Sequence, residues 1–254
     1  MIRSLPFISE LANLFFILLS TNFCFAQQQI LISSKSYEQP RIKYAAEQLI
    51  KILKQKGYEA IMYSSFKQLK PIKHIYINID SNLKRKESFS ITVSRKKDIL
   101  VSGADANGAL YGCLALVDTI KSTHKLPTKI NLIDSPKMVM RGTCIGIQKP
   151  YYLHGRTVYE YPYTPETFPW FYDKQMWVQY LDSLLENRMN SLYLWNGHPF
   201  SSLVKLKEYP YALEVDEATF KKNEEMFRFL TAEADKRGIW VIQMFYNILI
   251  PKPD

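Results

Sequence analysis

Cysteine is scarce in this sequence. Only Cys24, Cys113 and Cys144 occur among 254 residues, and Cys24 falls within a predicted leader peptide. In an exported protein the other two could pair. However, Cys113 falls on a predicted helix and Cys144 on a predicted buried strand, which favours two buried free thiols. No cysteine–histidine spacing suits zinc, so the sequence indicates neither a metal site nor any other cofactor.

Motifs for nucleotide binding and for nucleophilic hydrolysis are also missing. Neither a Walker lysine nor a dinucleotide-type glycine spacing accompanies the glycine-containing stretch at 102–112, which argues against a phosphate-binding loop. The four histidines, at 74, 124, 154 and 198, are scattered and suggest no Ser–His–Asp arrangement.

The basic charge is not concentrated in one place. The 33 Lys and Arg residues exceed the 24 Asp and Glu residues and give a net charge of +9, but they are spread over predicted helices and loops. Nucleic-acid-binding proteins usually gather basic residues on one face or motif. The pattern therefore argues against a nucleic-acid partner and favours a solvated basic surface, with attraction for an acidic polymer as the alternative.

Residues 1–26 have the features of a signal peptide. Arg3 gives a positive start, residues 11–25 are nearly all apolar, and Cys24-Phe25-Ala26 offers small residues near a cleavage point. A retained membrane anchor is disfavoured because the apolar run is short and no basic cluster follows it. A lipoprotein at Cys24 is a second alternative. We expect cleavage, no stable membrane insertion afterwards, and a periplasmic or secreted location.

Residues 27–135 are predicted to form a small α+β domain in which two helices cover one face of a sheet. The hydrophobic content of 47% and aromatic content of 14% exclude a disordered class. We expect a domain boundary near Ser135-Pro136. The predicted strands are 30–32, 58–63, 74–79, 89–93, 99–101 and 129–133, and the predicted helices are 40–57 and 109–120.

Residues 136–254 alternate apolar strand-like runs with amphipathic helices. The predicted strands are 138–147, 191–195 and 239–245, separated by helices at 173–189 and 217–237. This order is typical of parallel α/β units. We interpret it as the first three βα units of a (β/α)8 TIM-type barrel. The aromatic loop at 151–172 could stack on sugar rings, but for most of its rings we favour packing onto the barrel.

Several stretches resemble glycoside hydrolases of families 20 and 67. The run from Ser102 to Gly112, placed after a paired strand, is similar to the N-terminal domain that precedes the barrel in those families. Within it, Asp105 or Asn107 can cap the following helix, and Gly112 allows that helix to approach the sheet. Three further stretches are similar to parts of the family 20 barrel: Arg188-Met189-Asn190-Ser191-Leu192, Tyr209-Pro210 and residues 234–242.

The resemblance implies an exported glycosidase that acts on an oligo- or polysaccharide, either hexosaminidase-like or α-glucuronidase-like. The first and third strands depart from family 20, because residues 143–149 and 243–247 lack the acidic residues which that family carries there. Its catalytic aspartate–glutamate pair lies on strand four, which would fall beyond Asp254. We therefore expect this chain to be inactive by itself. The alternatives are a non-catalytic carbohydrate-binding protein and a module that docks partners.

A barrel binds its ligand at the carboxyl ends of its strands. We therefore expect the substrate-binding residues to follow the three strands. The alternative is that Arg141 pairs with an inner barrel carboxylate and Trp195 fills the core. The acidic residues Glu160, Glu208, Glu214 and Asp216 are interpreted as surface or helix-capping groups. The predicted substrate-binding residues are Arg141, Trp195, Asn196, His198, Gln243, Tyr246 and Asn247.

Overall fold

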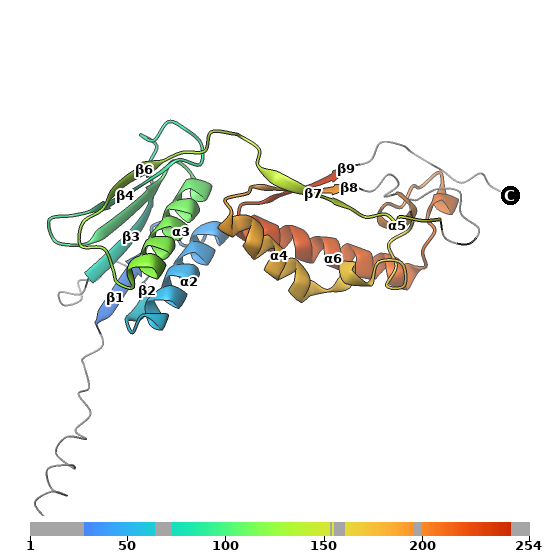
Figure 1. Ribbon diagram of the computed structural model, residues 1–254. Coiled ribbons are helices and arrows are strands. Elements are labelled where there is room, and N and C mark those ends of the chain that lie inside the picture. Colours follow the sequence, from blue (N-terminus) through green and yellow to red (C-terminus); the bar gives the residue numbers. More distant parts are fainter. Residues whose placement is uncertain (1–27, 64–72, 153, 155–160, 196–199, 245–254) are drawn as a thin grey trace, which may run out of the picture.

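The computed structural model describes residues 28–63, 73–152, 154, 161–195 and 200–244. The predicted signal peptide at 1–26 lies outside these residues. None of the described helices is long and apolar enough to cross a membrane. The chain has a mixed α/β structure with two separate sheets, each flanked by helices (Figure 1).

The first sheet has six strands in the order β2-β1-β3-β5-β4-β6. The strands β2, β1, β3 and β5 are parallel to one another, and β4 runs antiparallel to both β5 and β6. The antiparallel β4–β5 pair is formed by the predicted strands 89–93 and 99–101. The strand bounds are β1 Gln29–Ser33, β2 Glu59–Tyr63, β3 Lys73–Ile79, β4 Phe89–Val93, β5 Ile99–Gly103 and β6 Asn131–Asp134.

Two helices, α2 (Pro40–Gln55) and α3 (Ala106–Thr123), cover one face of this sheet (Figure 1). Proline at the first turn suits α2 because that position needs no backbone donor. Asp105 caps α3 by accepting a hydrogen bond from Gly108 N at 2.8 Å. Gly112 lies where α3 crosses the sheet, and a Cβ there would come within 2.7 Å of Val101 Cγ1. The sequence interpretation of this glycine is thus confirmed.

The second sheet has three parallel strands in the order β7-β8-β9, namely Gly142–Gly146, Ser191–Trp195 and Trp240–Met244. The connecting helices are α4 (Lys174–Glu186) and α6 (Glu217–Lys236), which lie on one face of the sheet (Figure 1). The capping residues are Asp173 for α4 and Asp216 for α6. Shorter helical turns are α5 Phe200–Leu203, η1 Pro169–Tyr172 and η2 Pro210–Ala212.

Two expectations about strand β7 are wrong. The predicted strand 138–147 is shortened to Gly142–Gly146, because pairing with β8 begins at Gly142, opposite Ser191. The residues before it form an exposed connector in which Val139 is 91% exposed. The thiol of Cys144 was expected to be buried but is exposed, because Cys144 points away from the helices. Cys113 is buried and unpaired, as predicted.

Most rings of the aromatic loop belong to the core. Tyr161, Tyr163, Phe168 and Phe171 are each at most 1% exposed. Tyr163 stacks on Phe171 with ring centroids 5.1 Å apart. These rings pack between the loop and the helices and do not offer a surface for sugar stacking.

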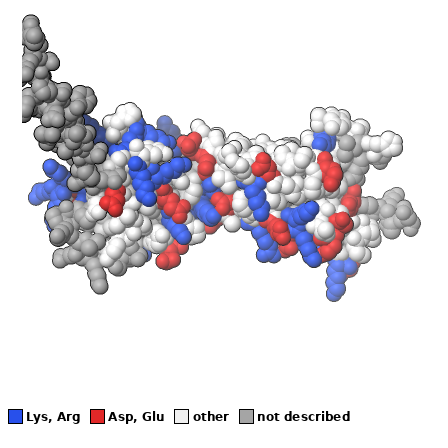
Figure 2. All heavy atoms as spheres, turned by 90° about the horizontal axis from the view of Figure 1, so that it is seen from below, with Lys and Arg blue, Asp and Glu red and all other residues white. Residues whose placement is uncertain are grey.

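Charged residues are dispersed over the helical side of the molecule. Figure 2 shows Lys and Arg interspersed with Asp and Glu on this face. Many are locally paired, for example Arg228 with Glu224 at 2.6 Å. This face has the solvated basic character that the sequence indicates, and no single basic stripe crosses it.

Candidate functional site

The face of the second sheet opposite α4 and α6 is left open by the described residues. Thr143, on the helical face, contacts the hydroxyl of Tyr180 in α4 at 2.7 Å. Side chains alternate along strands, so Cys144 faces the other way. The register of the three strands places further residues of the open face next to Cys144. They form two levels, Cys144, Tyr193 and Ile242 in one and Gly146, Trp195 and Met244 in the next.

Trp195 lies at the carboxyl end of β8 on this open face. Its side chain is 41% exposed, so it does not fill the core as the alternative required. Beside it, Gly146 leaves space, because a Cβ at that position would meet only Gln148, at 3.8 Å. One level below, the hydroxyl of Tyr193 donates to the sulfur of Met244. The open face thus carries an indole ring beside the Met244 side chain, with the Tyr193 and Ile242 side chains one level below.

Gln243 lies at the same end of the sheet but on the helical face. It is level with Leu194, which is fully buried. Its Nε2 donates to the backbone oxygens of Leu194 at 3.4 Å and Met244 at 3.1 Å. Its Oε1 is buried and accepts no hydrogen bond within the described residues. The structure therefore brings Trp195 and Gln243 to one end of the sheet but to opposite sides of it.

Four predicted substrate-binding residues lie outside the described residues. These are Asn196, His198, Tyr246 and Asn247. Each directly follows β8 or β9 in the chain, so their assignment stays a prediction from the sequence.

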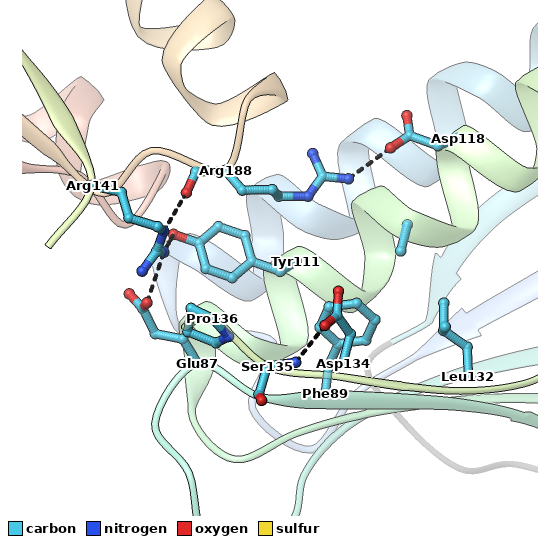
Figure 3. A pocket seen from close by; sticks show the side chains of 11 residues that line it. Glu87, Phe89, Tyr111, Asp118, Leu132, Asp134, Ser135, Pro136, Arg141 and Arg188 are labelled. Carbon is cyan, nitrogen blue, oxygen red and sulfur yellow. Dashed lines mark hydrogen bonds and ion pairs between the residues drawn. The ribbon is translucent and has the colours of Figure 1, made fainter. Parts of the chain in front are cut away.

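Arg141 is not where the sequence analysis expects it. It precedes β7 and so lies at the amino end of the sheet, a whole strand away from Trp195. There its Nη2 pairs with Glu87 of the first domain at 2.8 Å, as Figure 3 shows. The expectation that Arg141 joins a sugar site at the carboxyl ends is wrong. The alternative, pairing with an inner barrel carboxylate, is also wrong, because Glu87 belongs to the segment that precedes β4 of the first sheet.

The guanidinium of Arg141 has little capacity left for a ligand. Its Nε donates to the Arg188 backbone oxygen at 2.8 Å, and Nη1 donates to Met138 O at 2.7 Å. Besides Glu87, Nη2 reaches the hydroxyl of Tyr111 at 3.3 Å. A guanidinium has five N–H donors, and these contacts occupy most of them. Burial raises the pKa of Tyr111 to about 12, so its hydroxyl is a neutral partner at ordinary pH.

The same junction fixes the amino ends of all three strands. Glu87 accepts hydrogen bonds from Asn190, just before β8, and from Asn107, both at 3.1 Å. Asn107 also reaches the backbone oxygen of Gly238, just before β9, at 3.4 Å. Sequence reasoning missed Glu87 and treated Asn107 as a possible helix cap. No local signal could have found these roles, because the partners lie from 20 to 131 residues apart.

A pocket of about 330 Å³ opens beside this junction (Figure 3). Phe89, Leu132 and Pro136 supply apolar walls, and Arg188 lies at its edge with its Nη2 paired to Asp118 at 2.6 Å. Both arginines of the pocket are thus engaged within the protein. We assign this region a structural role in joining the domains.

The described part of the open face offers no pair of carboxyl groups. The acidic residues near α6 have other partners: Asp216 caps the helix, and Glu217 pairs with Lys205 at 2.7 Å. The hydrogen bond from Thr219 N lowers the pKa of Asp216, as expected for a capping carboxylate. Within the described residues, no cluster of three or more His, Cys, Asp or Glu side chains could hold a metal ion.

No protein-family model matches the chain, and no curated protein matches its sequence. Among solved structures, the chain is similar to a GH138 enzyme targeting pectin rhamnogalacturonan II. The identity is 54% and the TM-score 0.81 over 87% of this chain, which spans 32% of that enzyme.

Two more distant likenesses concern the fold alone. A GH115 4-O-methyl-α-glucuronidase with specificity for decorated arabinogalactans is 16% identical, with a TM-score of 0.51 over 85% of this chain and 28% of its own. A β-N-acetylhexosaminidase from Bacteroides fragilis is 17% identical, with a TM-score of 0.51 over 85% of this chain and 40% of its own. The chain thus spans less than half of each of these proteins. The structures that it resembles are glycoside hydrolases, as its sequence motifs indicate.

Proposed function

We propose that the complete product of this gene is an exported glycoside hydrolase that acts on a pectic polysaccharide. This chain would supply an N-terminal α+β domain and the first three βα units of a (β/α)8 barrel. The observation that carries the proposal is the 54% identity, over 87% of the chain, to an enzyme that targets pectin rhamnogalacturonan II.

The open face of the second sheet suits the interior of such a barrel. In a TIM-type barrel the helices lie outside and the opposite face of each strand points inward. Trp195 then lies at the carboxyl rim of the interior, where barrel enzymes bind their substrates. An exposed indole face there can stack on the apolar face of a sugar ring.

Two features favour an acidic polysaccharide over an N-acetylhexosaminide. Residues 143–149 and 243–247 lack the acidic residues that family 20 carries on its first and third strands. The net charge of +9 also favours attraction of a polymer rich in carboxylates.

The chain alone should not hydrolyse glycosides. Hydrolysis of this kind needs two carboxyl groups flanking the bond, and the described open face provides none. The alternative, a carbohydrate-binding protein without catalytic activity, would share the aromatic rim and the fold.

The test compares the complete gene product with the 254-residue chain. Each is incubated with rhamnogalacturonan II and with a chitooligosaccharide, and the released sugars are separated by chromatography. We expect release by the complete product from the pectic substrate only, and none by the chain alone. Release from the chitooligosaccharide alone would contradict the pectic assignment. Binding of the pectic substrate without release would support the non-catalytic alternative.

A further inference from the structure

The first sheet carries a hollow of about 470 Å³ at the carboxyl ends of its parallel strands. It lies away from the junction pocket of Figure 3, because the two share no lining residue. The residues that line the hollow are Lys35, Ser36, Ile77, Asn78, Ile79, Asp80, Leu100 and Ser102.

The position of the hollow in the sheet is one that binds ligands in other α/β proteins. After β1 the chain passes through α2 to β2 on one side, whereas after β3 it continues to β4 and β5 on the other. Adjacent parallel strands whose connections diverge leave a crevice beyond their carboxyl ends, which is a common ligand site. Lys35 and Ser36 follow β1, and Asp80 follows β3, so both sides of this divergence contribute to the lining.

Several polar side chains in the hollow have hydrogen-bonding capacity to spare. Ser102 is 5% exposed, yet its hydroxyl makes no hydrogen bond within the described residues, nor does the side-chain amide of Asn78. Asp80 uses Oδ1 to accept from the backbone and amide nitrogens of Asn82, both at 2.9 Å. Its Oδ2 is left for another donor. The Ser102 hydroxyl is reached by solvent rather than enclosed, so water or a ligand in the hollow can bond to it.

Two aromatic rings lie further back along β3, outside the lining of the hollow. Tyr76 precedes Asn78 by two residues on the same face of β3 and lies opposite Leu100 of β5. Its ring stacks on that of His74, with centroids 5.5 Å apart. A flat aromatic surface near amide, hydroxyl and carboxylate groups is well suited to a sugar ring, which has both an apolar face and hydroxyl groups.

We propose that this hollow binds a saccharide, with Asn78, Ser102 and Asp80 bonding its hydroxyl groups. Sugar hydroxyls both donate and accept, so they match a lining that contains an amide, hydroxyls and a carboxylate. The ammonium group of Lys35 makes no ion pair within the described residues and is the group that would attract a uronate carboxylate. A polyphosphate is a poorer match because it lacks the hydroxyl donors that Asp80 can accept from.

The inference rests on the proposed function only for the kind of ligand. Binding is measured here without hydrolysis, so a failure of this proposal is distinguishable from a failure of the catalytic one. The 254-residue chain is titrated by calorimetry with an oligogalacturonide and with a neutral cello-oligosaccharide. We expect binding of the acidic oligosaccharide, weakened about tenfold by Asn78→Ala and similarly by Ser102→Val. Lys35→Gln should remove the preference for the acidic over the neutral probe.

Asn131→Ala is the matched control for Asn78→Ala, because Asn131 is an exposed asparagine on the edge strand β6, outside the hollow. It should leave the affinity unchanged. Trp195→Ala separates this site from the barrel rim. If Trp195→Ala abolishes binding while the Asn78 and Ser102 variants bind like the wild type, the saccharide binds at the rim and the proposal is wrong. Absence of binding by the wild-type chain at millimolar concentrations also overturns it.

Discussion

Glu87 and Arg141 form an ion pair that joins the first sheet to the second, with Oε2 and Nη2 2.8 Å apart. Both side chains are largely buried, at 12% and 15% exposure. The same carboxylate accepts hydrogen bonds from Asn190 and Asn107. Glu87 thus contacts Arg141 before β7 and Asn190 before β8 directly. Through Asn107 it is linked to Gly238, which precedes β9. One side chain of the first domain therefore holds the start of every strand in the second sheet.

Glu87→Ala should lower the free energy of unfolding by about 3 kcal/mol, because it leaves the buried guanidinium of Arg141 without its carboxylate. Denaturant unfolding followed by circular dichroism measures this. Glu224→Ala is the control, since Glu224 pairs with Arg228 on an exposed helix surface, where ion pairs contribute little. Equal stability of the Glu87 variant and the wild type would show that the junction does not depend on this pair.

Gly238→Ala should be more harmful than Gly57→Ala. Both glycines have positive φ, +66° and +81°, so each substitution carries the strain of the left-handed conformation, about 1 kcal/mol. A Cβ at 57 meets nothing within 4 Å, whereas a Cβ at 238 overlaps the side-chain oxygen of Asn107. The difference between the melting temperatures of the two variants then measures the cost of the clash with Asn107. Equal losses would mean that Asn107 moves aside freely.

Tyr111→Phe should flatten the alkaline part of the stability profile. Burial raises the pKa of Tyr111 to about 12 from its ordinary value of about 10. The folded protein therefore holds this proton more tightly than the unfolded chain does. The contribution is complete below pH 10 and is lost as the pH rises through 12. Unfolding free energies measured from pH 8 to 12 should fall more steeply for the wild type than for the variant, and parallel curves would contradict this assignment.

Trp195→Ala and Asn196→Ala should weaken saccharide binding by the complete gene product about tenfold to a hundredfold. The melting temperature should change little, because Trp195 is 41% exposed and does not fill the core. Calorimetric titration and thermal melts are the two measurements. A loss of several kcal/mol in stability with unchanged affinity would make both residues part of the scaffold.

Residues 27–135 expressed alone should be soluble, whereas residues 136–254 alone should aggregate or remain molten. The second segment loses the contacts of Glu87 and also those of Arg41, whose guanidinium pairs with Asp235 at 2.6 Å. Within the described residues its three-stranded sheet also has two unpaired edges, one at β7 and one at β9. Size-exclusion chromatography and thermal melts test both segments. A cooperative, monomeric melt of 136–254 would show that the second segment folds without the first.

Local patterns in the sequence were enough to locate most helices and strands. Apolar spacing placed both domains' long helices, and the predicted strands of the first domain are present, with bounds shifted by a few residues. Glycine and capping signals were also sufficient at Asp105 and Gly112, because such roles depend on neighbours a few residues away or on one close approach. The likeness to glycoside hydrolases was visible in short stretches for the same reason.

Contacts between side chains that are distant in the sequence depend on how the elements pack. Arg141 stands next to a strand and resembled a substrate-binding residue, but the packing of the two domains brings Glu87 to it across 54 residues of chain. Cys144 is exposed because α4 covers the face of β7 that carries Thr143, and side chains alternate along a strand, so Cys144 lies on the other face. The hollow at Asn78 and Ser102 likewise arises from strand order, which places β1, β3 and β5 side by side although other elements separate them in the chain. Local periodicity carries no information on such long-range pairing, since it depends on how whole elements pack.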